Sequence, residues 1–162
     1  MRLHLVQVRL SSPSVTPLEP EQLDVWRAFL NAHVHVTRAI GRDLAAAGLP
    51  DLGWYDLLWT LYRAPERRLR VNELAREVVL SPTAMSRFVD RAEAAGVVRR
   101  EPDPADRRAL RVTLTDDGVA LLRRMWPVYE QGIERHFAAQ LDRSPQRLRA
   151  MLERIAASAR EG

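Results

Sequence analysis

Residues 80–118 constrain the fold of this chain more than any other stretch. Ser81 and Pro82 form a typical helix start, with serine in the N-cap position and proline at the first helical position. Apolar residues then recur at helical spacing until a glycine, and two short segments rich in valine and leucine follow at 97–100 and 109–114. The order predicts a short helix followed by a two-stranded hairpin.

The outer face of the predicted helix is suited to close approach to DNA. Its positions are small, hydroxyl-bearing or basic, and they are Ser81, Thr83, Ala84, Ser86, Arg87 and Arg91. The N-terminal part of a recognition helix enters the major groove, where Arg87 could reach a guanine edge or a phosphate. Arg91 could instead pair with Asp90 or Glu93 on a solvated face. The hydroxyls at the helix start could also serve only as caps, and the first serine could fill both roles.

The hairpin carries charge at its tip, at Asp106, Arg107 and Arg108. An arginine at a hairpin tip can enter a narrow minor groove, where the negative potential is concentrated. A solvated loop with local ion pairs is the alternative, and the preceding helix favours a DNA-binding wing. Pro102 and Pro104 in the connection are predicted to prevent further strand pairing on that edge.

Long helices are predicted on both sides of this segment. One runs from near Pro20 to near Ala47 and is apolar on two faces, which indicates two packing partners, its own domain and a second subunit. Shorter elements follow: a helix at 54–63, a strand at 69–71 and a helix at 72–79. A long helix capped by 115–117 and a last helix after Ser144-Pro145 complete the chain.

Composition excludes several classes of protein. The chain has 162 residues, a formal net charge of +4 and no cysteine, so disulfides and thiolate metal sites are excluded. No apolar run approaches a membrane span, and no signal peptide is evident, so a cytoplasmic location is expected by default. His33 and His35 point to different sides of a helix, and no catalytic set can be assembled. We therefore expect no metal, no cofactor and no enzymatic activity.

Two motifs resemble those of the MarR family of winged helix-turn-helix repressors. They are Asn72-Glu73-Leu74-Ala75 and the wing pattern Asp-x-x-Asp-Arg-Arg followed by Val-x-Leu-Thr-x-x-Gly. The resemblance covers roughly 20–160. It implies a mainly α fold with a small β-wing, in which the terminal helices of two subunits intertwine and the homodimer binds a pseudo-palindromic double-stranded operator.

This architecture divides the chain into four parts. They are a leader or linker at 1–17, an N-terminal dimerisation helix at 18–48, a winged helix-turn-helix domain at 49–115 and C-terminal dimerisation helices at 116–162.

Further contacts are expected around the wing. The resemblance implies that Asp103 or Asp106 holds the wing loop in shape through hydrogen bonds, and that Arg107 or Arg108 is the minor-groove finger. Arg70 and Asn72, at the start of the helix before the recognition helix, are expected at a phosphate, where a backbone amide and a polar side chain commonly bind.

A small aromatic anion as effector is implied by the resemblance alone. The residues placed to line its pocket are His35, Trp54, Asp56, Trp59 and Arg99. The chain is also similar to a urate-responsive subset, with Asp56, Arg87 and Arg99 at three charged positions of its site and no match for a fourth, a tryptophan. In the alternative interpretation the tryptophans belong to the core, and Asp56 and Arg99 form a structural ion pair.

Two functional hypotheses follow. The first is a homodimeric DNA-binding transcriptional repressor that a small ligand releases. The second is a winged-helix protein-interaction module without DNA binding, since winged helices also mediate protein contacts. Basic residues on both the predicted helix and the hairpin tip favour the first.

Overall fold

The structure is a computed structural model that describes residues 17–161 apart from 79, 104–105 and 142–143. Most of the predicted leader lies outside the described residues. The chain divides into two compact units, Met1–Val34 and His35–Gly162. Helix α1 (Pro20–Ala46) contributes to both units, as sequence periodicity predicted for one long helix.

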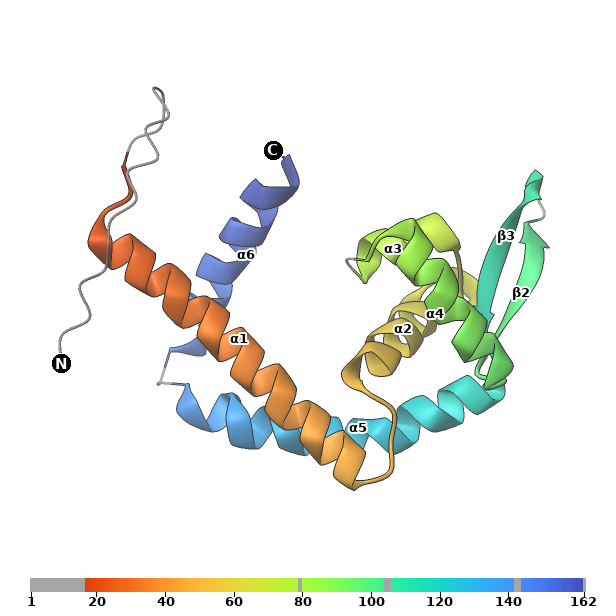
Figure 1. Cartoon of the computed structure of the whole chain (residues 1–162), viewed down its shortest axis with the longest axis horizontal. Coiled ribbons are helices and arrows are strands. Elements are labelled where there is room, and N and C mark those ends of the chain that lie inside the picture. The colour runs from red at the N-terminus through yellow and green to blue at the C-terminus, as the bar shows by residue number, and fades with distance from the viewer. Residues whose placement is uncertain (1–16, 79, 104–105, 142–143, 162) are drawn as a thin grey trace. The chain divides into compact units, whose positions relative to one another are not determined.

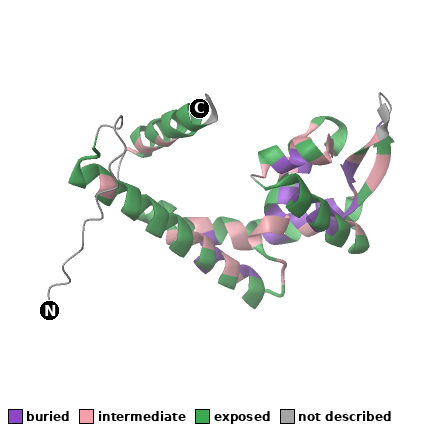
Figure 2. Ribbon diagram, turned by 45° about the horizontal axis from the view of Figure 1, so that its top comes forward, coloured by how far each residue is buried: buried purple, intermediate pink, exposed green. Residues whose placement is uncertain are grey.

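Within the first unit, the helix exposes large apolar side chains. Five of them are between 37% and 64% exposed, and they are Val25, Trp26, Phe29, Leu30 and Val34. Figure 2 shows this part of α1 almost wholly in the colour of exposed residues. A single chain therefore leaves this stretch of helix unburied.

The second unit has the element order that the sequence predicted (Figure 1). Two 3-10 turns, Pro65–Arg67 and Ala138–Gln140, lie between its helices and strands. The helices are α2 (Leu52–Arg63), α3 (Val71–Glu77), α4 (Pro82–Ala94), α5 (Asp116–His136) and α6 (Pro145–Glu161). The strands are β1 (Arg68–Arg70), β2 (Val98–Asp103) and β3 (Asp106–Leu114).

The three strands form an antiparallel sheet in the order β1-β3-β2. β2 continues to Asp103, and Pro102 lies opposite Leu110, so the prediction that prolines would end pairing after Arg100 was wrong. β2 is an edge strand, which tolerates proline because a missing N–H can face away from the partner strand. The wing is consequently longer than the sequence indicated, although Pro104 itself lies outside the described residues.

A single core joins the C-terminal part of α1, helices α2 to α5 and the three strands. Figure 2 shows buried residues concentrated on α2, α4 and the base of the hairpin. Its largest fully buried side chains are Leu44, Leu57, Leu58, Leu61, Leu74, Met85, Val89, Val98, Val112 and Met125. Ile40 and Leu44 anchor the C-terminal part of α1 in this core, and Ile40 packs against Gly132 of α5. These two positions confirm the prediction that one face of this helix packs against its own domain.

Helix α5 begins tightly against the sheet. Thr115 caps it by accepting a hydrogen bond from the Gly118 amide at 3.1 Å. A Cβ at Gly118 would overlap the Val97 carbonyl oxygen and the Leu114 side chain. The helix continues through Pro127 and ends at His136. None of the helices among the described residues is long and apolar enough to cross a membrane.

Candidate nucleic-acid interface

The sequence of α4 sets both its start and its orientation. The Ser81 hydroxyl accepts a hydrogen bond from the Ala84 amide at 3.2 Å, and Pro82 occupies the first turn. Four apolar residues bury the inner face of the helix, and they are Met85, Phe88, Val89 and Ala92. Because these positions recur at helical spacing, the opposite face points to solvent.

Every residue predicted to contact DNA from this helix lies on the exposed face. They are Ser81, Thr83, Ala84, Ser86, Arg87 and Arg91. Ser81 does form the cap, as one of the two interpretations held. The small side chains at the helix start leave the backbone accessible, which allows a groove to approach closely.

Arg91 does not pair with Asp90 or Glu93, contrary to the alternative considered from the sequence. Its guanidinium lies over the Phe88 ring, 5.1 Å from the centroid. Arg100 of β2 binds both acidic residues instead, with 2.5 Å contacts to Asp90 Oδ1 and Glu93 Oε2. From the sequence, only Arg91 of the same helix was considered as a partner for Asp90 and Glu93. Their actual partner, Arg100, lies on the strand that follows the helix.

These contacts also keep the Glu93 carboxylate charged. Its pKa is lowered, first by the hydrogen bond that the Arg100 backbone amide donates and then by the Arg100 guanidinium. The Arg100 side chain is 19% exposed. Because Arg100 belongs to β2 while Asp90 and Glu93 belong to α4, these ion pairs connect the helix to the wing.

Asp103, at the end of β2, makes a second set of ion pairs between the wing and its surroundings. Its side chain is 0% exposed and approaches Arg70 Nε at 2.6 Å and Arg111 Nε at 3.0 Å. A buried carboxylate requires such cationic partners, because an unpaired buried charge is costly. Of the two aspartates proposed to shape the wing, Asp103 thus has a defined role. The side chains of residues 104–108, including Asp106, Arg107 and Arg108, lie outside the described residues.

Arg70 and Asn72 lie at the start of α3, as predicted. Arg70 is the N-cap residue, and its amide donates to Glu73 Oε2 at 2.8 Å, while Asn72 in the first turn is exposed. The Arg70 side chain reaches the buried Asp103. Its contact with the base of the wing was not anticipated from the sequence, because the two residues are 33 positions apart.

Of the five residues proposed to line an effector pocket, Trp59 alone lines either of two pockets found among the described residues. His35 and Asp56 are exposed, and Trp54 makes an edge contact with Phe88 at 5.7 Å. Arg99 pairs with Glu101 Oε1 at 2.7 Å, so the alternative of an Asp56–Arg99 ion pair is not formed among the described residues. Trp59 is the member of the five that lines the α2–α5 pocket.

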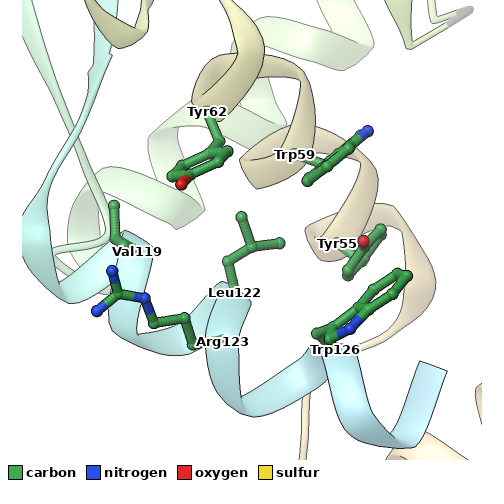
Figure 3. A pocket seen from close by; sticks show the side chains of 7 residues that line it. All are labelled: Tyr55, Trp59, Tyr62, Val119, Leu122, Arg123 and Trp126. Carbon is green, nitrogen blue, oxygen red and sulfur yellow. The ribbon is translucent and has the colours of Figure 1, made fainter. Parts of the chain in front are cut away.

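This α2–α5 pocket has a volume of about 260 Å³. Figure 3 shows its lining side chains, which are Tyr55, Trp59, Tyr62, Val119, Leu122, Arg123 and Trp126. Tyr55 stacks with Trp59 and with Trp126 at centroid distances of 6.3 and 6.2 Å. Arg123 provides the one cationic side chain of a lining that is otherwise aromatic and apolar.

A helix with an exposed polar face, a preceding short helix and an adjacent β-hairpin define a winged helix-turn-helix protein. The chain belongs to the MarR family of transcriptional regulators. The family model, described as MarR family, matches residues 47–109. The structure of Sco3205 from Streptomyces coelicolor, a MarR family regulator in complex with DNA, is 30% identical and superposes with a TM-score of 0.81, covering 91% of this chain and 92% of that one.

Curated relatives agree with this assignment. The regulator PecS of Dickeya dadantii (strain 3937) is 29% identical over 62% of this chain, which spans 61% of the PecS length. The transcriptional repressor IacR of Pseudomonas putida is 27% identical over 79% of this chain and 74% of its own length. The fold and the relatives are those of transcriptional regulators and not of enzymes.

Proposed function

We propose that this protein is a homodimeric, sequence-specific regulator that binds double-stranded DNA and represses transcription. The observation that carries the proposal is the exposed face of α4, which presents Ser81, Thr83, Ser86 and Arg87 beside an antiparallel wing. In such a module the helix reads the major groove and the wing reaches a neighbouring groove. The DNA complex of Sco3205 supports binding to DNA. The relative IacR is a transcriptional repressor, which supports repression over activation of transcription. Binding to chromosomal DNA would place the protein in the cytoplasm.

The exposed apolar face of α1 supports the proposed dimer. Val25, Trp26, Phe29, Leu30 and Val34 form a contiguous helical surface, and Met151 and Ile155 on α6 are exposed as well. Monomeric proteins rarely expose apolar patches of this kind. A twofold dimer would also present two copies of α4, which matches a pseudo-palindromic operator with half-sites about one DNA turn apart.

The α2–α5 pocket is the proposed effector site. Its stacked rings suit a planar aromatic ligand, and Arg123 suits one negative charge on that ligand. Of the five effector-site residues predicted from the sequence, the proposed site includes Trp59. The other residues of the proposed site are its neighbours on α2 and α5. A ligand there releases DNA only if it prefers an arrangement of the protein that binds DNA poorly.

The experiment that tests DNA binding is selection of bound fragments from a genomic library by the purified full-length protein, followed by footprinting. We expect enrichment of inverted repeats with half-sites about 10 base pairs apart. Uniform recovery of all fragments, or none, would contradict sequence-specific binding and favour the protein-interaction module. Aromatic carboxylic acids are then added to the operator complex, and Arg123→Met is compared with wild type. Release that persists in Arg123→Met would remove Arg123 from the effector site.

A further inference from the structure

Arg100 joins the first wing strand to the outer part of α4 at three points. Its guanidinium contacts Asp90 Oδ1 and Glu93 Oε2, each at 2.5 Å, and donates to the Ser86 carbonyl at 3.3 Å. Its own amide donates to Glu93 Oε1 at 2.8 Å. Both terminal nitrogens of the guanidinium, Nη1 and Nη2, are thus engaged by one helix. The point charge of a lysine does not reproduce this geometry.

The three helix positions lie along one side of α4, at intervals of four and three residues. Ser86 and Asp90 belong to the exposed surface of the helix, beside Arg87. β2 and β3 in turn pair continuously from Val98–Leu114 to Pro102–Leu110, and after a register shift Asp103 pairs with Asp106. A side chain on β2 therefore connects the helix surface that faces a groove with the strand that leads to the wing tip.

The ion pairs of Arg100 also neutralise negative charge on α4. Asp90 and Glu93 are carboxylates on a helix that would lie against phosphates, and unpaired they would repel DNA. Arg100 holds both, and the lowered pKa of Glu93 is consistent with a persistent ion pair. The two carboxylates thus act as attachment points between the helix and the wing, with their charge compensated within the protein.

We propose that Arg100 is a positioning residue for DNA recognition, which fixes the recognition helix and the wing relative to each other so that they engage the operator as one unit. This inference rests on the proposed function. Arg100 need not touch a base or a phosphate, because it acts through Ser86, Asp90 and Glu93. Its loss should therefore reduce discrimination between operator and random DNA more than it reduces general affinity, which depends on phosphate contacts.

The test compares the full-length Arg100→Met and Arg100→Lys variants with wild type. Arg99→Met is the matched control, since it removes the same charge from the adjacent position, where the partner is Glu101 on the same strand. Dissociation constants are measured for the selected operator and for random DNA at one salt concentration. Thermal unfolding followed by circular dichroism reports whether each variant is folded.

We expect Arg100→Met to lower the ratio of operator to random-DNA affinity by roughly tenfold, within the range typical of coupled charged neighbours. Arg100→Lys should recover part of that ratio, and Arg99→Met should weaken both DNAs about equally. An unchanged ratio in folded Arg100→Met, or an equal fall in Arg99→Met, would overturn the proposal.

If Arg100→Met does not fold, Glu93→Gln gives the same information, because it weakens the attachment while leaving the arginine in place. We expect a smaller fall in the same ratio, and an unchanged ratio would overturn the proposal. The proposed function fails in a different way, since wild-type protein would then show no preference for any DNA sequence.

Discussion

The arginines of the candidate nucleic-acid interface make different contacts, which the residue type alone does not predict. Arg87 is exposed on the outer face of α4, whereas Arg91 covers the Phe88 ring and Arg100 binds the two carboxylates of that helix. Arg70 and Arg111 compensate the buried Asp103. Direct base readout from the described arginines is therefore expected chiefly from Arg87.

Arg87→Ala should weaken operator binding by about 1–3 kcal/mol, because a bidentate contact with guanine is lost. The loss on random DNA should be smaller. Fluorescence anisotropy titrations with both DNAs at fixed salt measure the two effects. Equal losses would reassign Arg87 to a phosphate contact.

Tyr55 makes the stability of the protein sensitive to alkaline pH. Burial raises its pKa to about 12, with further contributions from Tyr129 and Asp56. An unfolded tyrosine ionises near pH ~10, so the contribution of Tyr55 is fully present below that pH and is lost as pH rises towards 12. Urea unfolding at pH values on both sides of this window should show a smaller decline in stability for Tyr55→Phe than for wild type. An identical decline would rule out the buried phenol as its cause.

At the scale of elements, the winged region depends on a few close contacts between segments that are distant in sequence. Asp103 holds the end of β2 to the start of α3 through Arg70, and Gly118 lets α5 begin against Val97. These contacts orient the wing and the long helix relative to the core.

The wing tip is expected to supply phosphate or minor-groove contacts through Arg107 and Arg108. Replacing both with alanine should weaken binding to most sequences and reduce the slope of log affinity against log salt by roughly one unit per lost phosphate contact. Titrations at several salt concentrations measure the slope. Arg124→Ala, an exposed residue of α5, is the control for loss of charge. A slope that remains at the wild-type value in the folded double variant would exclude the wing from phosphate binding.

Gly118→Ala should destabilise the protein by roughly 1–3 kcal/mol, because the added methyl group would overlap the Val97 carbonyl and Leu114. Gly41→Ala is the matched control. It lies in α1, and no atom outside the helix backbone lies within 4 Å of the place its added methyl group would take, so the same substitution should be neutral or stabilising by about 0.5–1 kcal/mol. Chemical denaturation gives both values, and equal effects would contradict the role of close packing at the start of α5.

At the scale of the whole molecule, the proposed second subunit would cover the exposed apolar surface of α1. We expect sedimentation equilibrium at micromolar concentration to report twice the chain mass of 18.5 kDa. Replacing Trp26 and Phe29 together with glutamate should shift the population towards monomer, because charges would be placed in the apolar contact. A wild-type protein that sediments only as the monomer would disprove the dimer and the twofold operator geometry derived from it.

The sequence by itself determined the secondary-structure order and the exposed face of α4. Both depend on local periodicity and capping: Ser81 and Pro82 start the helix, and Met85, Phe88, Val89 and Ala92 recur at the spacing of one buried face. The domain-facing end of α1, at Ile40 and Leu44, was predictable for the same reason.

Only the tertiary structure decided which charged groups meet. Arg100 binds the carboxylates of α4, Asp103 binds Arg70, and the aromatic pocket pairs α2 with α5. Such contacts depend on strand register and on how helices pack. A residue type and its neighbours in sequence do not specify these features, because many distant partners of the same charge are available along the chain. The pairing of Pro102 across the hairpin likewise required knowledge that β2 lies at the edge of the sheet.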